Sequence, residues 1–198
     1  MDIFFEEKSE KRKFVTEQAQ EAIGKTLNAI SLKDYFPQEP RKKMIAILGA
    51  GVAIEAVSFT SYFTANDFEK PHIVAFDQDA FSMEVTERLV PKDLDFKYRK
   101  ANIVKDETFD DEQYDMIIVR NPNVHASESD WKKIFSNGFK HLKQGGVFLA
   151  TTDIHQDFIR NELKAGGKIV REYEIPDVNK VGPYFNESNL FIAIKTNQ

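Results

Sequence analysis

A pair of glycines near residue 50 is the part of this sequence best suited to bind a ligand. The apolar run Met44–Leu48 ends in Gly49-Ala50-Gly51, and the residues after it have helical periodicity. Glycines permit a tight turn and a close approach of the backbone to a ligand, and the following helix directs its unpaired N–H groups and positive dipole end toward the same place. The pattern predicts a site for a nucleotide-like molecule, with a plain strand-to-helix turn as the alternative.

Polar groups also follow three further predicted strands, two of them apolar runs and one, residues 96–99, an alternation of aromatic and basic residues. In an open α/β sheet, ligands bind beyond the carboxyl ends of the strands, so we expect these groups to share one site. A carboxylate such as Asp77 can accept two hydrogen bonds from ribose hydroxyls, and Asn102 can both donate to and accept from a purine edge. Asp79 is better explained as the N-cap of the next helix. The three groups are Asp77-Gln78-Asp79, Asn102-Ile103 and Arg120-Asn121-Pro122.

The hydrophobic pattern predicts the elements that would position these residues. Short apolar runs predict strands, and apolar residues spaced three and four apart between them predict helices, which gives five strand-and-helix units followed by two strands. Residues 176–189 leave no room for a crossover helix, so the last strand must be antiparallel. The prediction is an α/β, Rossmann-like three-layer sandwich around a seven-stranded, mostly parallel sheet. Its strands cover residues 44–48, 72–76, 96–99, 116–119, 147–150, 168–175 and 190–195.

An amphipathic helix over residues 13–30 precedes this domain, because its apolar residues fall on one stripe. Pro37 and Pro40 lie within a stretch, residues 31–41, that we interpret as a linker. The chain therefore divides into a helical extension and linker, 1–41, and a Rossmann-like domain, 42–198. We expect the extension to be a structural helix that covers a sheet edge, with a lid over a substrate pocket as the alternative.

Cap residues predict where the last two helices begin and end. Ser127 or Ser129 is expected to cap a helix that ends at Gly145-Gly146. Asp153 is expected to cap the next helix, which the glycine pair at 166 and 167 would end.

Composition excludes several classes of protein. The 198 residues, 41% hydrophobic and 30% charged, suit one globular domain, and no apolar run approaches the roughly 18 residues of a membrane span. The chain has no cysteine, which excludes disulfides, thiolate metal sites and a cysteine nucleophile. A net charge of −5 argues against a broad nucleic-acid-binding face. The charged amino-terminal stretch does not resemble an export signal, so we expect a cytoplasmic protein.

The order of these motifs resembles that of the class I S-adenosylmethionine-dependent methyltransferases. The resemblance covers about residues 44–195 and includes the segments 47–53, 114–119 and 141–147, Asp77, and the terminal strand pair. It implies S-adenosylmethionine as cofactor, with the glycine segment near its methionine part, Asp77 on the ribose, Gln78 beside the adenine and Asn102 near the adenine amino group. The cofactor-binding residues that it implies are Gly49, Ala50, Gly51, Asp77, Gln78, Asn102, Ile103 and Asn121.

The sequence departs from the family's pattern at three positions. Ile47 stands where an acidic residue is common, Ala53 replaces a third glycine, and Asn102 replaces a frequent aspartate. Ala53 adds only a methyl group, whereas Ile47 removes a carboxylate that would help to hold the charged end of the cofactor.

Two residues after the fourth strand are candidates for catalysis. Asn121-Pro122-Asn123-Val124 is similar to the Asn-Pro-Pro-aromatic motif of amino-group methyltransferases but lacks the second proline and the aromatic residue. Asn121 could align a nucleophilic amine with the methyl carbon, or it could simply form a turn with Pro122. His125 could act as a base near neutral pH, although a lone loop histidine is more often a surface residue.

We therefore expect a methyltransferase that acts on an N or O nucleophile of a small molecule. A protein or a structured RNA is an alternative acceptor. The sequence predicts no metal site. A catalytically degenerate binding or scaffold protein of the same fold is the first alternative. An NAD(P)-binding Rossmann protein is the second, and it is disfavoured because Ile54 stands where the dinucleotide fingerprint needs glycine or alanine. The sequence makes no prediction about oligomeric state.

Overall fold

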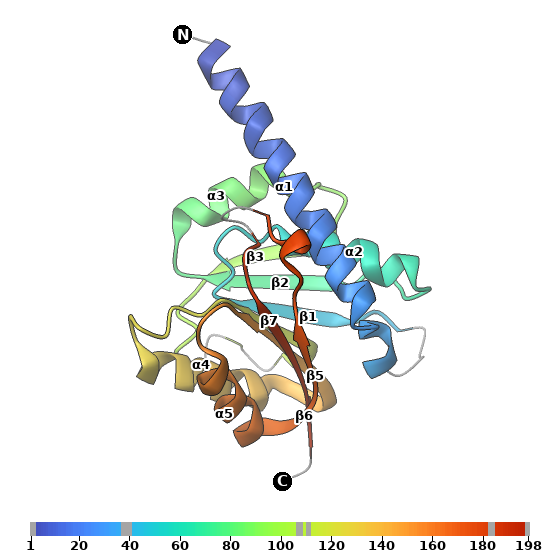
Figure 1. The fold of residues 1–198 in the computed structure, drawn as a ribbon, viewed down its shortest axis with the longest axis vertical. Coiled ribbons are helices and arrows are strands. Elements are labelled where there is room, and N and C mark those ends of the chain that lie inside the picture. Colours follow the sequence, from blue (N-terminus) through green and yellow to red (C-terminus); the bar gives the residue numbers. More distant parts are fainter. Residues whose placement is uncertain (1–2, 37–40, 106–108, 110–111, 182–184, 197–198) are drawn as a thin grey trace.

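A seven-stranded sheet with helices on both faces forms the body of the protein (Figure 1). The structure, a computed structural model, describes residues 3–36, 41–105, 109, 112–181 and 185–196, with side chains from residue 15 onward. Its helices are α1 (Ile3–Ala29), α2 (Glu55–Ala65), α3 (Ala80–Leu89), α4 (Glu128–His141) and α5 (Gln156–Gly166), with short 3-10 helices η1 (Leu32–Tyr35) and η3 (Asp177–Asn179). Its strands are β1 (Met44–Leu48), β2 (His72–Asp77), β3 (Phe96–Lys100), β4 (Tyr114–Arg120), β5 (Leu142–Thr152), β6 (Gly167–Glu174) and β7 (Asn189–Lys195).

The strand order is β3-β2-β1-β4-β5-β7-β6. Strands β1 to β5 pair in parallel, whereas β7 runs antiparallel to both β5 and β6. The predicted mostly parallel sheet with an antiparallel last strand is therefore confirmed. The connection from β6 to β7 accounts for the reversal, because its described residues contain only the three-residue η3, whereas a parallel return usually needs a crossover helix.

Side chains that alternate along the strands build a separate core on each face of the sheet. On one face Ile45 and Ile47 of β1 pack in a cluster with residues of α1 and α2. On the other face Ala46 and Leu48 pack in a cluster with residues of α4 and α5. Strands β1, β2 and β4 are apolar on both faces for this reason, as is usual for parallel strands between two helical layers.

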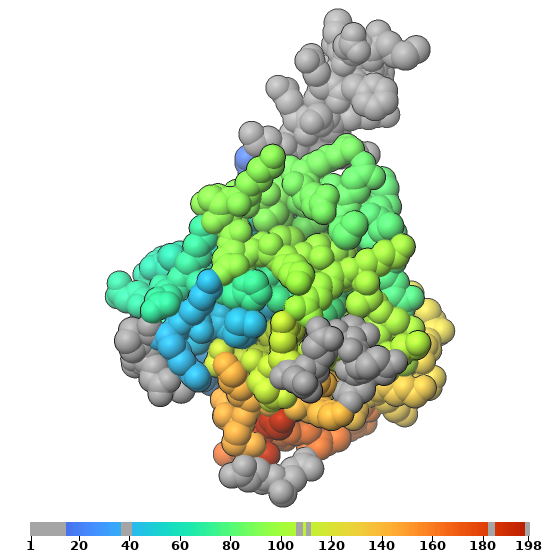
Figure 2. Space-filling view, turned by 180° about the vertical axis from the view of Figure 1, so that it is seen from behind, coloured from blue at the N-terminus to red at the C-terminus, as the bar shows by residue number. Residues whose placement is uncertain are grey.

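The edge strand β3 is less buried than its neighbours. Seen from behind, α3 and β3, in green, occupy the middle and upper surface, with the carboxyl-terminal strands below them (Figure 2). Lys97 and Lys100 are exposed, which agrees with a charged edge that discourages pairing with another chain.

The first helix is longer than predicted and begins at Ile3 rather than near residue 13. Its amino-terminal part extends beyond the sheet, and its carboxyl-terminal half lies alongside α2 (Figure 1). The predicted apolar stripe is confirmed where Ala19, Ile23 and Leu27 enter the core. None of the helices in the described ranges is long and apolar enough to cross a membrane.

The predicted linker 31–41 has structure of its own. Residues 32–35 form η1, and Leu32 and Phe36 are buried in the same core as β1, so the interpretation as a plain linker is wrong over these residues. Pro37 and Pro40 lie outside the described residues.

Two predicted helix boundaries are also wrong. Helix α4 ends at His141, not at Gly145-Gly146, because Leu142 already pairs with Tyr114 at the start of β5. The N-cap of α5 is His155 rather than Asp153, since β5 continues to Thr152 and the chain needs the next residues to turn. Ser127 does occupy the N-cap of α4, but its side chain makes no capping hydrogen bond there. The expected end of α5 at the glycine pair 166–167 is confirmed.

Candidate functional site

The sheet brings the predicted site residues to one edge. Asn102 follows β3, Asp77 ends β2, Gly49 follows β1 and Asn121 follows β4, and these strands are neighbours in this order. Backbone hydrogen bonds join adjacent strand ends, as from the amide of Ala50 to the carbonyl of Phe76 at 3.0 Å. The order of strands reverses between β1 and β4, and such a switch point is where open α/β sheets bind ligands.

Both glycines after β1 adopt left-handed backbone angles, with φ of 65° at Gly49 and 51° at Gly51. A Cβ at Gly49 would lie 3.0 Å from Cη2 of Trp131, so this glycine is needed for packing against α4. A Cβ at Gly51 would meet nothing within 4 Å. The backbone of Gly51 therefore borders open space, where a ligand can approach closely.

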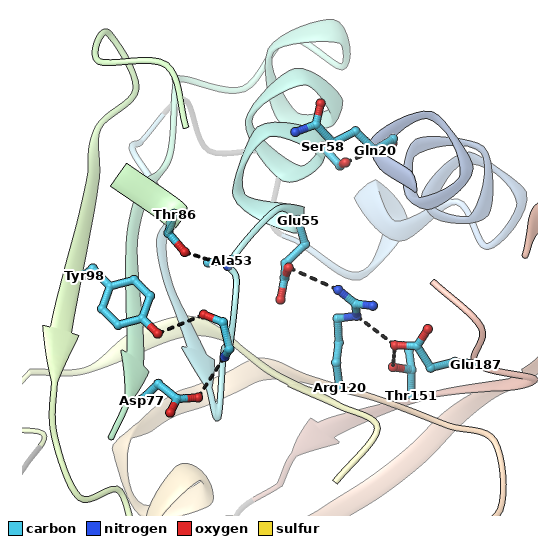
Figure 3. Close-up of polar contacts among 11 residues, drawn as sticks. Gln20, Ala53, Glu55, Ser58, Asp77, Thr86, Tyr98, Arg120, Thr151 and Glu187 are labelled. Atoms are coloured by element: carbon cyan, nitrogen blue, oxygen red, sulfur yellow. Dashed lines mark hydrogen bonds and ion pairs between the residues drawn. The ribbon is translucent and has the colours of Figure 1, made fainter. Parts of the chain in front are cut away.

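Asp77 holds the glycine turn in place. Its Oδ2 accepts a hydrogen bond from the amide of Gly51 at 2.8 Å (Figure 3). Its Oδ1 accepts one from the amide of Asp79 at 2.9 Å. An ionised carboxylate offers about four acceptor positions, so each oxygen retains capacity for a ribose hydroxyl. The residue predicted to bind a ribose is thus half-buried beside the glycine whose backbone borders open space.

Tyr98 is a member of this site that sequence reasoning missed. Its hydroxyl donates to the carbonyl of Gly51 at 2.8 Å, so β3 and β2 together hold both polar groups of that glycine (Figure 3). Burial, with a further contribution from the carboxylate of Asp77, raises the pKa of Tyr98 and keeps the hydroxyl a donor. The pairing of Tyr98 with Ala75 across β3 and β2 sets this position, and the sequence does not show it.

Helix α3 supports the same turn. Asp79 accepts hydrogen bonds from the amides of Phe81 and Ser82, both at 3.1 Å, which confirms it as the N-cap. The hydrogen bonds that Asp79 accepts from the Ser82 hydroxyl and from these two amides lower its pKa. Further along α3, the hydroxyl of Thr86 accepts from the amide of Ala53 at 3.1 Å, which fixes the start of α2 (Figure 3).

The residues predicted near the base have mixed roles. Gln78 and Asn102 are exposed at the strand ends. Asn102 uses its Oδ1 to accept from the amide of Val104 at 3.1 Å, which forms a local turn. Ile103 is buried beside Gly49 in the core cluster on the α4 and α5 face, so it supplies apolar surface next to the glycine turn.

Asn121 and the loops after β4 and β5 form the other half of the edge. Asn121 has a left-handed φ of 39°, which is strained for a residue other than glycine. Its amide donates to the carbonyl of Thr151 at 2.8 Å, and its Oδ1 lies 3.5 Å from the amide of Asp153. Oδ1 of Asp153 is buried without a hydrogen-bond partner among the described residues. Asn121 thus joins two adjacent strand ends in a strained conformation.

The structure places His125 against His155, with ring centroids 4.5 Å apart. His155 had no supporting context in the sequence, because it follows β5 and lies far along the chain from His125. Only the parallel pairing of β4 with β5 brings the two loops together.

A buried ionic cluster lies next to Asn121 on the α1 face of the sheet. Arg120 donates through Nη1 to Oε2 of Glu55 at 3.1 Å and through Nε to Oε1 of Glu187 at 2.8 Å (Figure 3). Both carboxylates are 1% exposed. Burial raises the pKa of Glu55, and the pKa of Arg120 is raised because the two carboxylates outweigh its own burial. No sequence motif indicated a role for Glu55 or Glu187.

Ile47, where an acidic residue is common in the family that the sequence resembles, is buried in the first core cluster. A carboxylate there would lie among apolar side chains such as Ile45 and Ile118. Within the described ranges, no three His, Asp or Glu side chains are grouped so as to hold a metal ion.

The fold matches known structures at low sequence identity. No protein-family model and no curated protein matches the chain. The N-methyltransferase NodS from Bradyrhizobium japonicum has 10% sequence identity and a TM-score of 0.65, with 90% of this chain and 97% of that chain covered. Magnesium protoporphyrin IX methyltransferase from Synechocystis, solved with bound S-adenosylmethionine, has 12% identity and a TM-score of 0.63, with 92% and 84% covered.

A third structure supports the same assignment. An S-adenosylmethionine-dependent methyltransferase from Clostridium acetobutylicum has 13% identity and a TM-score of 0.61, with 92% of each chain covered. The protein therefore has the class I S-adenosylmethionine-dependent methyltransferase fold, as the motif resemblance implied.

Proposed function

We propose that this protein is an S-adenosylmethionine-dependent methyltransferase that acts on an N or O nucleophile of a small molecule. The observation that carries the proposal is the arrangement of Gly51, Asp77 and Tyr98 at the switch point of a methyltransferase fold. A glycine backbone beside open space and a carboxylate with spare acceptor capacity are what a nucleoside with a charged tail requires.

The proposal assigns each part of the edge to a part of the cofactor. Gly49, Ala50 and Gly51 would lie along the methionine portion, and Asp77 would accept hydrogen bonds from the ribose hydroxyls. Gln78, Asn102 and Ile103 would surround the adenine, the first two through polar edges and Ile103 through its apolar side chain. Asn121 would lie near the reactive end, because β4 is the next strand after β1.

When bound, the cofactor supplies a methyl group on a positively charged sulfur, and the lone pair of the acceptor forms the new bond to carbon while the carbon–sulfur pair stays with sulfur. The chain's own contribution is to hold the acceptor in line with that methyl group, since orientation alone can supply a large part of the acceleration. Asn121 is suited to orient a nucleophile, because two adjacent strand ends fix its backbone and side chain.

A binding or scaffold protein of the same fold is the second candidate. The buried Ile47 favours it, because the carboxylate common at this position is absent and the surrounding side chains are apolar. The two candidates differ in a measurable way, since only the methyltransferase must bind the cofactor.

Isothermal titration calorimetry with S-adenosylmethionine and S-adenosylhomocysteine tests the proposal. We expect micromolar binding, and we expect Asp77→Ala to weaken it by about 100-fold, because two charge-assisted hydrogen bonds are lost. Asp157→Ala removes a carboxylate from an exposed position of α5 and is the matched control, with unchanged binding. Absence of heat at millimolar ligand would favour the scaffold, and binding of NADH in its place would favour a dinucleotide site.

A further inference from the structure

A groove beside the proposed cofactor site contains the two histidines. It has a volume of about 730 Å³, within the range of pockets that hold drug-sized ligands. Val124 and Phe158 supply apolar surface, and His125 and His155 supply two heteroaromatic rings. The groove lies over the loops after β4 and β5 and over the first turns of α4 and α5.

The groove continues the same sheet edge. The residues assigned to the cofactor follow β3, β2, β1 and β4, and the groove is lined by residues that follow β4 and β5. Neighbouring strands lie about 4.8 Å apart, so the end of β5 is only about 10 Å from the end of β1. A molecule of modest size in the groove would therefore have one end near Asn121, at the reactive end of the cofactor.

The ring nitrogens of the histidine pair are available to a ligand. The rings meet edge to face at 70°, and neither has a hydrogen-bond partner within the described part of the chain. The amide of His155 donates to the hydroxyl of Thr152 at 3.0 Å, which anchors this residue at the start of α5. His125 is exposed in the Asn121 loop and packs on the anchored ring.

The other charged groups that line the groove are Glu128, Lys132 and Glu162. Glu128 and Lys132 form an ion pair with each other at 2.6 Å.

We propose that this groove binds the methyl acceptor as a planar aromatic compound with a hydroxyl group, that His125 accepts the hydroxyl proton, and that His155 is the positioning residue. The inference rests on the proposed methyltransferase function. The hydroxyl proton moves to a ring nitrogen of His125, the oxygen keeps the electron pair of the O–H bond, and the imidazolium then releases the proton to water. A hydroxyl needs such a base more than a neutral amine does, because the amine already carries a free lone pair.

Nuclear magnetic resonance of the histidine rings, with para-nitrophenol as the probe, tests the groove without any methyl transfer. We expect saturable shifts of the His125 and His155 signals, and none for His72 and His141, which lie outside the groove. The absorbance of the bound phenol should also change toward the phenolate form. Unchanged signals of His125 and His155 at saturating phenol would overturn the inference.

Two variants separate the roles of the rings. His125→Asn should weaken phenol binding about tenfold, as for the loss of one hydrogen bond, and should remove the acidic limb of the pH profile of phenol methylation. His155→Asn should weaken phenol binding less and should leave that limb in place. His72→Asn is the control, because it removes a histidine at the start of β2 and should change neither measurement.

Binding of S-adenosylhomocysteine is measured on the same samples and should be unchanged in all three variants. Failure of the wild-type protein to bind it would count against the proposed function. If the cofactor binds normally but His125→Asn keeps both the phenol affinity and the acidic limb of the pH profile, the assignment of the groove is wrong and the proposed function stands.

Discussion

Arg120 should be one of the most costly residues to replace, because it neutralises two buried carboxylates. At an effective dielectric constant of about 20, contacts of 3.1 Å with Glu55 and 2.8 Å with Glu187 correspond to about 5 and about 6 kcal/mol before desolvation. Removal of the cation from such a buried group leaves uncompensated charge, and the net loss is typically about 3–5 kcal/mol. We therefore expect Arg120→Met to lower the free energy of unfolding by about 3–5 kcal/mol at neutral pH.

Urea unfolding as a function of pH measures this loss. Without Arg120, burial should hold the pKa of Glu55 still further above that of the unfolded chain, so the folded state binds more protons and stability falls as pH rises above about 4.3. The deficit should thus be largest at neutral pH and should shrink toward about pH 5. The wild type should show the same trend more weakly, because the pKa of Glu55 is already raised by burial.

Arg160→Met is the matched control. Arg120 lies over the ring of Phe185, and Arg160 likewise lies over the ring of Phe191. Arg160 also bonds to two carboxylates, but these partners are exposed. Its replacement should cost less than about 1 kcal/mol from the ion pairs. A deficit for Arg120→Met that is no larger than this, or one that grows on acidification, would refute the account of the cluster.

Three further predictions concern the site. Tyr98→Phe removes the donor to the Gly51 carbonyl and should weaken binding of S-adenosylhomocysteine about tenfold by calorimetry, whereas unchanged affinity would mean that the turn needs no such support. Gly51→Ala should lower the free energy of unfolding by about 1–2 kcal/mol through backbone strain alone, because φ is 51° and a Cβ there meets no atom within 4 Å. Gly24→Ala, inside α1, should instead raise the free energy of unfolding by about 0.5–1 kcal/mol, because alanine is the better helix former. Asp79→Ala should lower the melting temperature at neutral pH. Since the pKa of Asp79 is lowered in the folded state, this difference should vanish as pH falls through the folded-state pKa, and a difference that persists in acid would exclude the cap as its cause.

Much of the site could be predicted because its residues follow strands that the sequence pattern predicts. Gly49 and Asp77 come directly after apolar runs, Asn121 follows Arg120 at the end of another, and Asn102 follows a strand in which aromatic and basic residues alternate. Parallel strands bring their carboxyl ends to one edge. Tyr98 could not be predicted, because its role depends on the pairing of β3 with β2 and on the direction of its side chain.

Helix ends were harder to predict than the helices themselves. Gly145-Gly146 is a normal helix terminator, yet α4 stops at His141 because Leu142 is already paired in β5. Asp153 is a normal N-cap, yet its amide lies against Asn121 and α5 begins after His155. In both cases strand pairing between distant segments prevailed over a local signal of about 1 kcal/mol.

The sequence by itself determined the alternation of strands and helices, the antiparallel last strand and the position of the glycine turn, because these follow from periodicity, connection length and the absence of a Cβ. Only the tertiary structure decided which side chains meet. It joins Arg120 to Glu55 and Glu187, because the order of strands in the sheet differs from their order in the chain, and it sets His125 against His155 through the parallel pairing of β4 with β5. Contacts of this kind depend on distances through space, and a linear pattern of residues does not contain them.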